Sequence, residues 1–313
     1  MKTIDRNQVF ALLPIEACIH VMRSTFFKLS KKASIQYLRK AILLPDNDIF
    51  GLMPAYLDDQ YFGAKVITVF PGNLGSRLPS HQGVVLLFDS RNGELLATVD
   101  GNAITQLRTG AVSALATDAL ARPDASRIAF LGAGAQARAH LAAIRLVRPL
   151  TSVSVYDVDQ GYAESFAEQA RAKYNMEATA ANSPKEAVRY ADIVCTLTYA
   201  SEPLLYKADI MPGAHINAIG ACFPQRRELS TDLIAASRLF GDDREAVFNE
   251  SGDFLIPLAE RAISKAHYLG DLTQLLFEGL VGRTCGTDIT LFKALGLAIE
   301  DVAAAKYVYE NSL

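Results

Sequence analysis

The segment 127–137, RIAFLGAGAQA, constrains the fold more than any other part of this sequence. An apolar run at 128–131 leads into a turn that carries Gly132 and Gly134, and a helix-like stretch at 136–147 follows. This order predicts the start of a βαβ unit, in which glycines let the backbone turn sharply and approach a pyrophosphate closely. The N–H groups at the start of the helix then face the phosphate charge. The segment therefore predicts a dinucleotide-binding domain; the alternative is a structural glycine turn in an unrelated α/β fold.

The pattern of the sequence after Pro123 supports a dinucleotide-binding domain. Short apolar segments alternate there with helical ones, as in a doubly wound parallel sheet. Strands are expected at 128–131, 152–156, 193–196, 215–218 and 238–241, and a final helix at 291–311. The expected fold class is therefore α/β, with a Rossmann-type doubly wound parallel sheet.

The residues before this domain predict a second folding unit, since a chain of 313 residues suggests about two domains. Helices are expected at 7–30 and 106–121. Between them lie segments rich in aromatic and β-branched residues, separated by turn residues. These segments are 35–44, 49–56, 61–70, 83–89 and 95–100. They predict an α+β unit with a mostly antiparallel sheet or an open barrel, suited to hold a substrate.

Composition and charge exclude several classes of protein. The net charge is −3 and no long basic or acidic run occurs, so neither nucleic acid nor an anionic membrane surface is an expected partner. Cys18, Cys195, Cys222 and Cys285 are scattered without CxxC spacing, which predicts a reduced cytoplasmic protein with no metal site. The first residues have no signal-type apolar core, and no window approaches the ~20 apolar residues of a membrane helix.

Four charged residues are candidates for binding or chemistry. Asp157 ends the stretch SVSVYD, where an acid can accept both ribose hydroxyls; no arginine follows to hold a 2′-phosphate, which favours NAD over NADP. Lys65 lies in an apolar strand, either as an edge lysine that reaches water or as a carboxylate ligand and proton donor. Arg39 has the same two interpretations. Arg108 is either a solvent-facing residue or a forked anion ligand, if a helix begins near Thr109.

Other polar residues carry weaker predictions. His81 is either an acid/base group or a structural hydrogen-bonding residue. Cys222 follows the expected strand 215–218 and is placed to line a site, but no base is evident that would make it a nucleophile. Asp242 and Asp243 follow another strand and are expected to cap a helix.

Several stretches, taken in order, resemble the ornithine cyclodeaminase/mu-crystallin family from about Arg39 to Asp301. They are GAKVITVFPGN, LPSHQGVVLLFD, DGNAITQLRTGAVSALATDALAR, LGAGAQARAH, INAIGACFPQRREL and TDITLFKALGLAIED. The resemblance implies hydride transfer between NAD(P) and the α-carbon of an amino acid or cyclic imine. It also implies a homodimer, a Rossmann domain at 116–289, and a substrate and dimerisation domain at 1–115 plus about 290–313.

The resemblance also implies roles for individual residues. Arg39, Lys65 and Arg108 would hold the substrate carboxylate, with Lys65 also placed for proton transfer. The implied dinucleotide contacts are Ser80, Arg108, Thr109, Gly132, Gly134, Ala135, Gln136, Asp157, Thr198 and Gly220.

One departure from the family pattern bears on the reaction. Ornithine cyclodeaminases carry an aspartate after the glycines that follow the INAIG-type strand, as the acid/base group for ammonia loss and ring closure. Here the stretch Gly220-Ala221-Cys222-Phe223-Pro224 has no acid, in a loop expected to be one residue longer. We therefore expect NADH-dependent reduction of a small cyclic ketimine, such as pyrroline-2-carboxylate, or of a related 2-imino acid.

Three alternatives to the reductase stay open. The first is ornithine cyclodeamination with another group in place of the aspartate. The second is an alanine-dehydrogenase-like amino-acid dehydrogenase. The third is a non-catalytic protein that binds a small ligand, although a pure binder has no need of three clustered cations.

Overall fold

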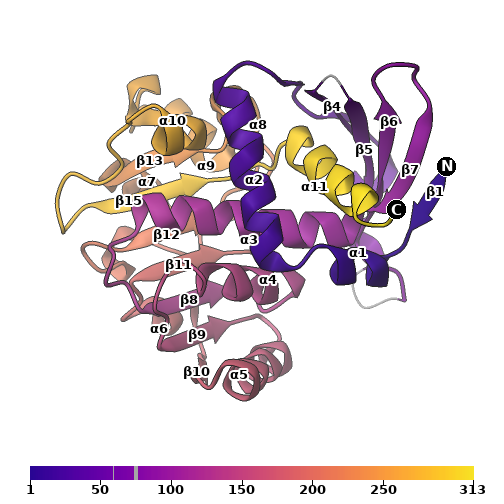
Figure 1. The fold of residues 1–313 in the computed structure, drawn as a ribbon. Helices are drawn as coiled ribbons and strands as arrows, with labels where there is room; N and C mark the ends of the chain where they lie inside the picture. Colours follow the sequence, from indigo (N-terminus) through magenta and orange to yellow (C-terminus); the bar gives the residue numbers. More distant parts are fainter. Residues whose placement is uncertain (59, 74–76) are drawn as a thin grey trace. The chain divides into compact units, whose positions relative to one another are not determined.

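A computed structural model describes residues 1–58, 60–73 and 77–313, and this part of the chain forms two compact units (Figure 1). The N-terminal unit comprises Met1–Val112 and Gly296–Leu313, and the central unit comprises Ser113–Leu295. Helix α3 (Gly101–Leu120) leads from the first unit into the second. Which unit holds a substrate and which a cofactor stays a prediction at this point.

A mixed sheet builds the N-terminal unit, in the order β1-β7-β6-β5-β4-β2, with β3 also paired to β4. Its strands are β1 (Lys2–Ile4), β2 (Ile35–Gln36), β3 (Lys40–Leu43), β4 (Ile49–Asp58), β5 (Tyr61–Val69), β6 (His81–Asp89) and β7 (Leu95–Asp100). All pairs are antiparallel except β1 with β7. The predicted antiparallel sheet is confirmed, but the segment 35–44 forms two short strands rather than one.

Strand β4 shows how this sheet acquires two different faces. Ile49, Met53 and Leu57 are buried, whereas Phe50 and Leu52 between them are 38% and 37% exposed. Alternate side chains of a strand point to opposite faces, so one face of β4 is core and the other is open. Helix α11 (Ala298–Glu310) packs against β4, β5 and β6, and α2 (Ile15–Ser30) packs against α11. The last helix of the chain therefore completes the core of the N-terminal unit.

Two predicted helices differ from the structure at their ends. The expected helix 7–30 is split into α1 (Arg6–Leu12) and α2, because Pro14 cannot continue the first helix and takes an extended conformation before the second. The expected helix 106–121 begins earlier, at Gly101, where Asp100 Oδ1 accepts a hydrogen bond from the N–H of Ala103 at 2.7 Å. In the described ranges no single helix is long and apolar enough to cross a membrane; α1 and α2 meet that test only as a pair bent by 81°.

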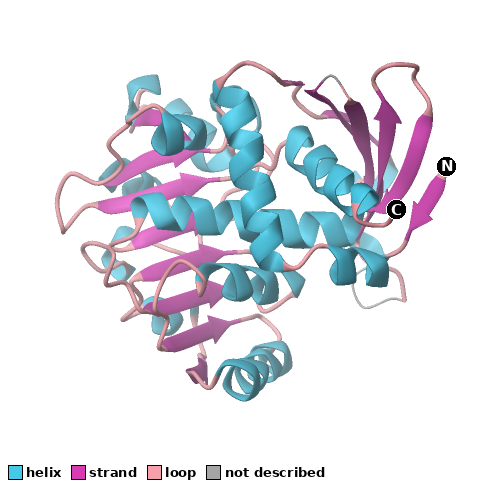
Figure 2. Cartoon of the chain, in the orientation of Figure 1, coloured by secondary structure: helices cyan, strands magenta, loops and turns pink. Residues whose placement is uncertain are grey.

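A parallel sheet builds the central unit, in the order β10-β9-β8-β11-β12-β15-β13-β14. Its strands are β8 (Arg127–Leu131), β9 (Ser152–Tyr156), β10 (Glu177–Ala180), β11 (Ile193–Thr196), β12 (His215–Ala218), β13 (Ser237–Gly241), β14 (Tyr268–Asp271) and β15 (Ile289–Lys293). Its helices are α4 (Ala135–Ile144), α5 (Gln160–Tyr174), α6 (Pro184–Val188), α7 (Thr231–Ala236), α8 (Arg244–Glu250), α9 (Gly252–Ala259) and α10 (Leu272–Phe277). Short 3-10 helices lie at Pro45–Asn47, Pro71–Asn73, Lys207–Asp209 and Lys265–His267. Figure 2 shows helices in front of and behind the strands, so the Rossmann-type prediction is confirmed.

The strand β15 corrects the prediction for the end of the chain. Residues 291–293 were expected to begin the final helix, but they belong to a fully buried strand between β12 and β13, and α11 begins only at Ala298. A short apolar run has no periodicity that separates a buried strand from a helix. The strands β10 and β14, at the two edges of this sheet, were not predicted.

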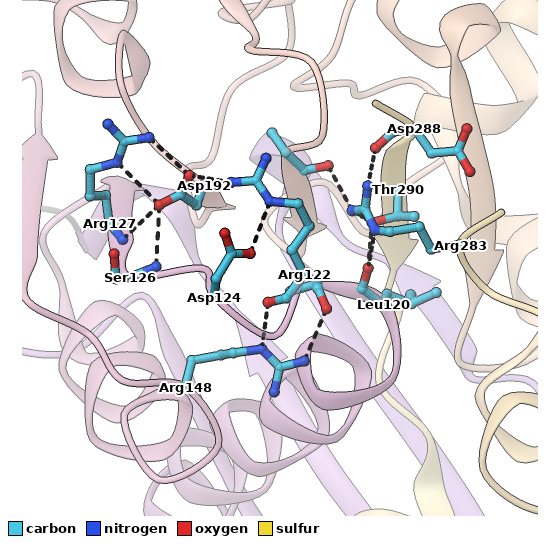
Figure 3. Close-up of polar contacts among 12 residues, drawn as sticks. Leu120, Arg122, Asp124, Ser126, Arg127, Arg148, Asp192, Arg283, Asp288 and Thr290 are labelled. Carbon is cyan, nitrogen blue, oxygen red and sulfur yellow. Dashed lines mark hydrogen bonds and ion pairs between the residues drawn. The ribbon is translucent and has the colours of Figure 1, made fainter. Parts of the chain in front are cut away.

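Asp192 fastens the amino ends of the parallel strands (Figure 3). Its carboxylate accepts hydrogen bonds from the Arg122 guanidinium at 2.8 Å, from the Arg127 guanidinium at 3.0 and 3.1 Å, and from the backbone N–H of Ser126 at 3.2 Å. Burial alone would raise the pKa of Asp192, but these donors hold it below its usual value. The ion pairs at this end of the sheet therefore have a structural role.

Candidate functional site

The order of the parallel strands creates a switch point at the carboxyl end of β8. From β8 the chain passes to β9 and β10 on one side, then returns to β11 on the other side. Open α/β sheets bind ligands where the strand order reverses, because the loops after the two neighbouring strands diverge. Gly132 follows β8, and Thr198 and Gly220 follow β11 and β12, so these predicted cofactor residues lie at the same edge.

Two glycines shape the loop between β8 and α4. Gly132 has a φ of +100°, and a Cβ there would lie 2.8 Å from the carbonyl oxygen of Leu197, so a side chain is excluded. Gly134 is the N-cap of α4 and provides no side-chain cap, and no heavy atom lies within 4 Å of the place a Cβ would take. The start of α4, at Ala135 and Gln136, therefore presents backbone N–H groups without a competing cap, as a pyrophosphate requires.

Asp157 follows β9 and lies beside this loop. Its Oδ2 accepts a hydrogen bond from the N–H of Ala133 at 2.7 Å, and its Oδ1 accepts one from the N–H of Asp159 at 3.0 Å. The predicted ribose ligand is thus attached directly to the glycine loop. A negative charge at this point disfavours a 2′-phosphate.

Glu228 holds the loops after β11 and β12, and sequence reasoning missed it. Its Oε1 accepts hydrogen bonds from the N–H and Oγ1 of Thr198 at 2.8 and 2.7 Å. Its Oε2 accepts from Thr196 Oγ1 and Gly220 N–H, both at 2.8 Å, and from Ala221 N–H at 3.2 Å. The side chain is fully buried. Burial raises its pKa, and the charge of Lys293 opposes that rise. Glu228 therefore sets the positions of two predicted cofactor contacts.

A buried ion pair between Asp253 and Lys293 holds the backbone at Glu228. Asp253 Oδ1 accepts hydrogen bonds from the backbone N–H groups of Glu228 and Leu229 at 2.9 and 3.1 Å, and its Oδ2 lies 2.9 Å from Lys293 Nζ. Lys293 ends β15, the strand that was expected to be a helix. No local sequence signal marks the link between Glu228, Asp253 and Lys293, because the three residues come from separate segments.

In the N-terminal unit, Lys65 lies on the core face of β5, with Met53 and Val85 as its neighbours in register. The side chain is 2% exposed, so Lys65 is not an edge lysine that reaches water, and its role as a carboxylate ligand and proton donor stays a prediction. Its Nζ lies 2.7 Å from Asp301 Oδ2 and 3.3 Å from Thr105 Oγ1. A buried ammonium needs such partners, because desolvation without them is costly.

Arg108 joins Lys65 through the same carboxylate. Its Nε donates to Asp301 Oδ1 at 3.1 Å, and its NH1 donates to Glu300 Oε2 at 2.8 Å. A Cβ on Gly296 would lie 2.6 Å from NH1, so glycine makes room for the guanidinium. The prediction that Arg108 stands at a helix start near Thr109 is wrong: both residues are buried in the interior of α3, and Thr109 Oγ1 donates to Thr105 O at 2.6 Å.

Electrostatics in this cluster suit a proton donor. Burial lowers the pKa of Lys65 and the charge of Asp301 raises it; together with the charges of Arg108 and Arg39, which also lower it, the pKa is about 8. The charge of Arg39, the third predicted cation, also acts on Lys65. Burial raises the pKa of Glu300, while Arg108 opposes the rise. An ammonium with a pKa near 8 is mostly protonated at neutral pH but can release its proton, as a general acid must.

The remaining predicted residues have mixed outcomes. Ser80 Oγ lies 3.1 Å from His81 Nδ1, and desolvation and the charge of Lys65 lower the pKa of His81. Cys222 Sγ donates to the Ile219 carbonyl at 3.3 Å. Asp243 caps α8 as expected, by accepting from Ala246 N–H, but Asp242 instead accepts from Leu295 N–H at 2.6 Å. Within the described residues no group of three His, Cys, Asp or Glu side chains could hold a metal ion.

Comparison with known proteins places this chain among its relatives. The sequence profile of the ornithine cyclodeaminase/mu-crystallin family matches residues 4–313. Ketimine reductase mu-crystallin of Mus musculus is 36% identical over 308 residues, which cover 98% of this chain and 93% of the mouse protein.

Two of the solved structures that match over the full length of this chain contain a bound nicotinamide cofactor. One is Δ1-pyrroline-2-carboxylate reductase of Thermococcus litoralis in complex with NADH and L-proline, with a TM-score of 0.97, 36% identity and coverage of 100% and 97% of the two chains. The other is an archaeal alanine dehydrogenase dimer with bound NAD, with a TM-score of 0.94, 28% identity and coverage of 100% and 96%. The sequence profile and these similarities agree with the glycine loop and the buried Lys65–Arg108 cluster: the chain belongs to the ornithine cyclodeaminase/mu-crystallin family.

Proposed function

We propose that this chain reduces a small cyclic ketimine carboxylate, such as pyrroline-2-carboxylate, to the L-amino acid with NADH. The observation that carries the proposal is the buried cluster of Lys65 and Arg108 around Asp301. Its two cations can bind a substrate carboxylate, and Lys65 can also donate a proton. The names of the mouse and Thermococcus litoralis relatives support the same reaction.

The central unit supplies the proposed cofactor site. Gly132, Gly134 and the start of α4 would hold the pyrophosphate, and Asp157 the ribose of the adenosine half. Thr198 and Gly220 would line the cofactor further along the same edge, with Glu228 fixing both loops. The family resemblance also implies Ser80, Arg108 and Thr109, in the N-terminal unit, as dinucleotide contacts, and these stay predictions. A bound NADH supplies the hydride.

The N-terminal unit supplies the proposed substrate ligands. Arg39, Lys65 and Arg108 give three cations against the two acids Glu300 and Asp301, which leaves one positive charge for a substrate carboxylate to balance. Reduction of a C=N bond consumes one hydride and one proton. We assign that proton to Lys65, because a protonated imine accepts hydride far better than a neutral one. Lys65 is then reprotonated from solvent.

Ornithine cyclodeamination fits the site less well. It requires an acid at the loop 220–224, where Ala221 is buried and Cys222 is a thiol. The acid beside this loop is Glu228, but its two oxygens already accept five hydrogen bonds and it has no exposed surface. Glu228 is therefore a structural ligand of the loop rather than a replacement for the aspartate.

A spectrophotometric assay tests the proposed reaction. Purified protein with NADH and pyrroline-2-carboxylate is expected to lose absorbance at 340 nm and form L-proline, with NADPH a poorer donor because of Asp157. Parallel reactions with pyruvate plus ammonia, and with L-ornithine plus catalytic NAD, test the dehydrogenase and the cyclodeaminase. Formation of proline and ammonia from ornithine, with an inert imine, would refute the reductase.

We further propose that the chain forms a homodimer through the open face of the N-terminal sheet. Ile42 and Phe50 are opposite each other on β3 and β4 and are 60% and 38% exposed, and Leu52 extends the patch. The related archaeal alanine dehydrogenase is a dimer. Light scattering is expected to give twice the chain mass, and the double variant I42D/F50D is expected to give the monomer mass. Val158→Asp, at a 93% exposed apolar residue of the central unit, is the control that should stay dimeric; an unchanged mass for I42D/F50D would contradict the proposed face.

A further inference from the structure

Two adjacent acids in the first turn of α11 engage the predicted substrate ligands. Glu300 and Asp301 have no exposed surface. Acids are stabilised at a helix N-terminus by its partial positive charge, and Glu300 Oε2 also accepts from the N–H of Leu297 at 3.2 Å. The helix is in turn fixed on β4, β5 and β6.

The two acids have different partners. Glu300 forms its ion pair with Arg108, whereas Asp301 bridges both cations, with one oxygen 3.1 Å from Arg108 Nε and the other 2.7 Å from Lys65 Nζ. The carboxylate of Asp301 thus fixes the distance between the Lys65 ammonium and the Arg108 guanidinium. Neither cation can shift toward a substrate without disturbing the other.

We propose that Asp301 is a positioning residue for the proposed imine reduction, which holds Lys65 and Arg108 as one preorganised pair. The proposal rests on the proposed function, because it assigns a purpose to the carboxylate behind the substrate ligands. Asp301 acts through Lys65 and Arg108 rather than on the reacting atoms. Fixed donors need no rearrangement when the substrate binds, and that is the source of their catalytic effect.

Asp301 also sets the pH range of activity. The charged groups around Lys65 are Asp301 and Glu300 on α11, Arg108 on α3, Arg39 before β3, and His81 on β6. Burial, Arg108 and Arg39 lower the pKa of Lys65, and Asp301 raises it. Removing the charge of Asp301 therefore lowers this pKa further. Since imine reduction needs the protonated amine, the pH above which activity falls must then be lower in a protein without this charge.

The variant Asp301→Asn tests this inference through the pH profile. In the unaltered protein, kcat/KM for pyrroline-2-carboxylate is expected to fall as the pH rises through about 8. In D301N we expect this alkaline limb to move to lower pH by roughly one unit, which alone lowers kcat/KM at pH 7.5 about threefold, and loss of the fixed donor geometry is expected to bring the total reduction to about tenfold or more. The Kd for NADH, measured by fluorescence, is expected to stay within about twofold because most of the proposed dinucleotide contacts lie in the loops after β8, β9, β11 and β12 of the central unit, and of the others only Arg108 contacts Asp301.

Two further variants separate positioning from general damage. Asp192→Asn breaks a buried ion-paired aspartate at the amino end of the central sheet and should lower Tm without moving the alkaline limb. Asp301→Glu keeps the charge but shifts it by one methylene, so the limb should stay near pH 8 while kcat falls. If D301N does not fold, D301E carries the test, and a wild-type kcat/KM for D301E would overturn the proposal.

The outcomes distinguish this inference from the proposed function. An unaltered protein that does not oxidise NADH with the imine overturns the function and the positioning role together. Turnover by the unaltered protein, with a D301N limb that has not moved, overturns the role of Asp301 alone. A shift of the limb in D192N as large as that in D301N would also overturn it, since loss of stability would then explain both.

Discussion

Replacing Lys65 by alanine is expected to lower kcat for imine reduction by about 10²–10⁴-fold, the usual contribution of a positioned general acid. Lys65 is buried, its Nζ lies 2.7 Å from Asp301, and its pKa is lowered by burial to about 8. The Kd for NADH should stay within about twofold, because the loss is in the chemical step and not in cofactor binding. Steady-state kinetics and a fluorescence titration measure the two quantities.

The variant Lys65→Met separates the ammonium from the space it fills. Methionine has nearly the same length, so K65M removes the charge without leaving a large cavity, and its kcat is expected to be as low as that of K65A. Lys65→Arg keeps a charge but cannot donate a proton near neutral pH, so its alkaline limb should disappear. Turnover of K65M within tenfold of the unaltered protein would show that Lys65 does not supply the proton.

The change Glu228→Gln is expected to raise the Kd for NADH by about 10- to 100-fold. The carboxylate accepts five hydrogen bonds from Thr196, Thr198, Gly220 and Ala221. A glutamine has one acceptor oxygen, and its NH₂ group would face N–H donors of the loops. An unsatisfied buried donor costs about 1–3 kcal/mol, and each 1.4 kcal/mol corresponds to about a tenfold change in affinity. Titration of NADH fluorescence measures the loss.

Glu245→Gln is the matched control for this change, because it removes the same charge from an exposed position on α8. Its NADH affinity and Tm should be close to those of the unaltered protein. E228Q should also lower Tm, since the loops after β11 and β12 lose their common anchor. A lower Tm with an unchanged Kd for NADH would mean that Glu228 stabilises the central unit but does not position its cofactor loops.

Local patterns in the sequence determined much of the central unit. The strands 128–131, 152–156, 193–196 and 215–218 could be predicted because their length and flanking residues favour a strand, which periodicity alone does not decide. The proximity of Gly132, Gly134 and Asp157 in one loop cluster could be predicted from the order of strand, glycine turn and helix. Lys65 was recognisable because a charged residue in an apolar strand needs an explanation.

Contacts between distant segments were decided only by the tertiary structure. Arg108 and Asp301 are 193 positions apart, and nothing near Asp301 marks it as the partner of Lys65. Glu228 reads in the sequence as one more charge in a polar loop, although it is buried and binds two strand ends. The strand β15 enters the middle of the sheet from the end of the chain. The sequence by itself determined most strands of the central unit and the glycine turn after β8, because those depend on neighbouring residues. Which acids face the cations depends on how the chain packs, because a buried charge needs a partner and that partner can come from any segment that the fold brings next to it.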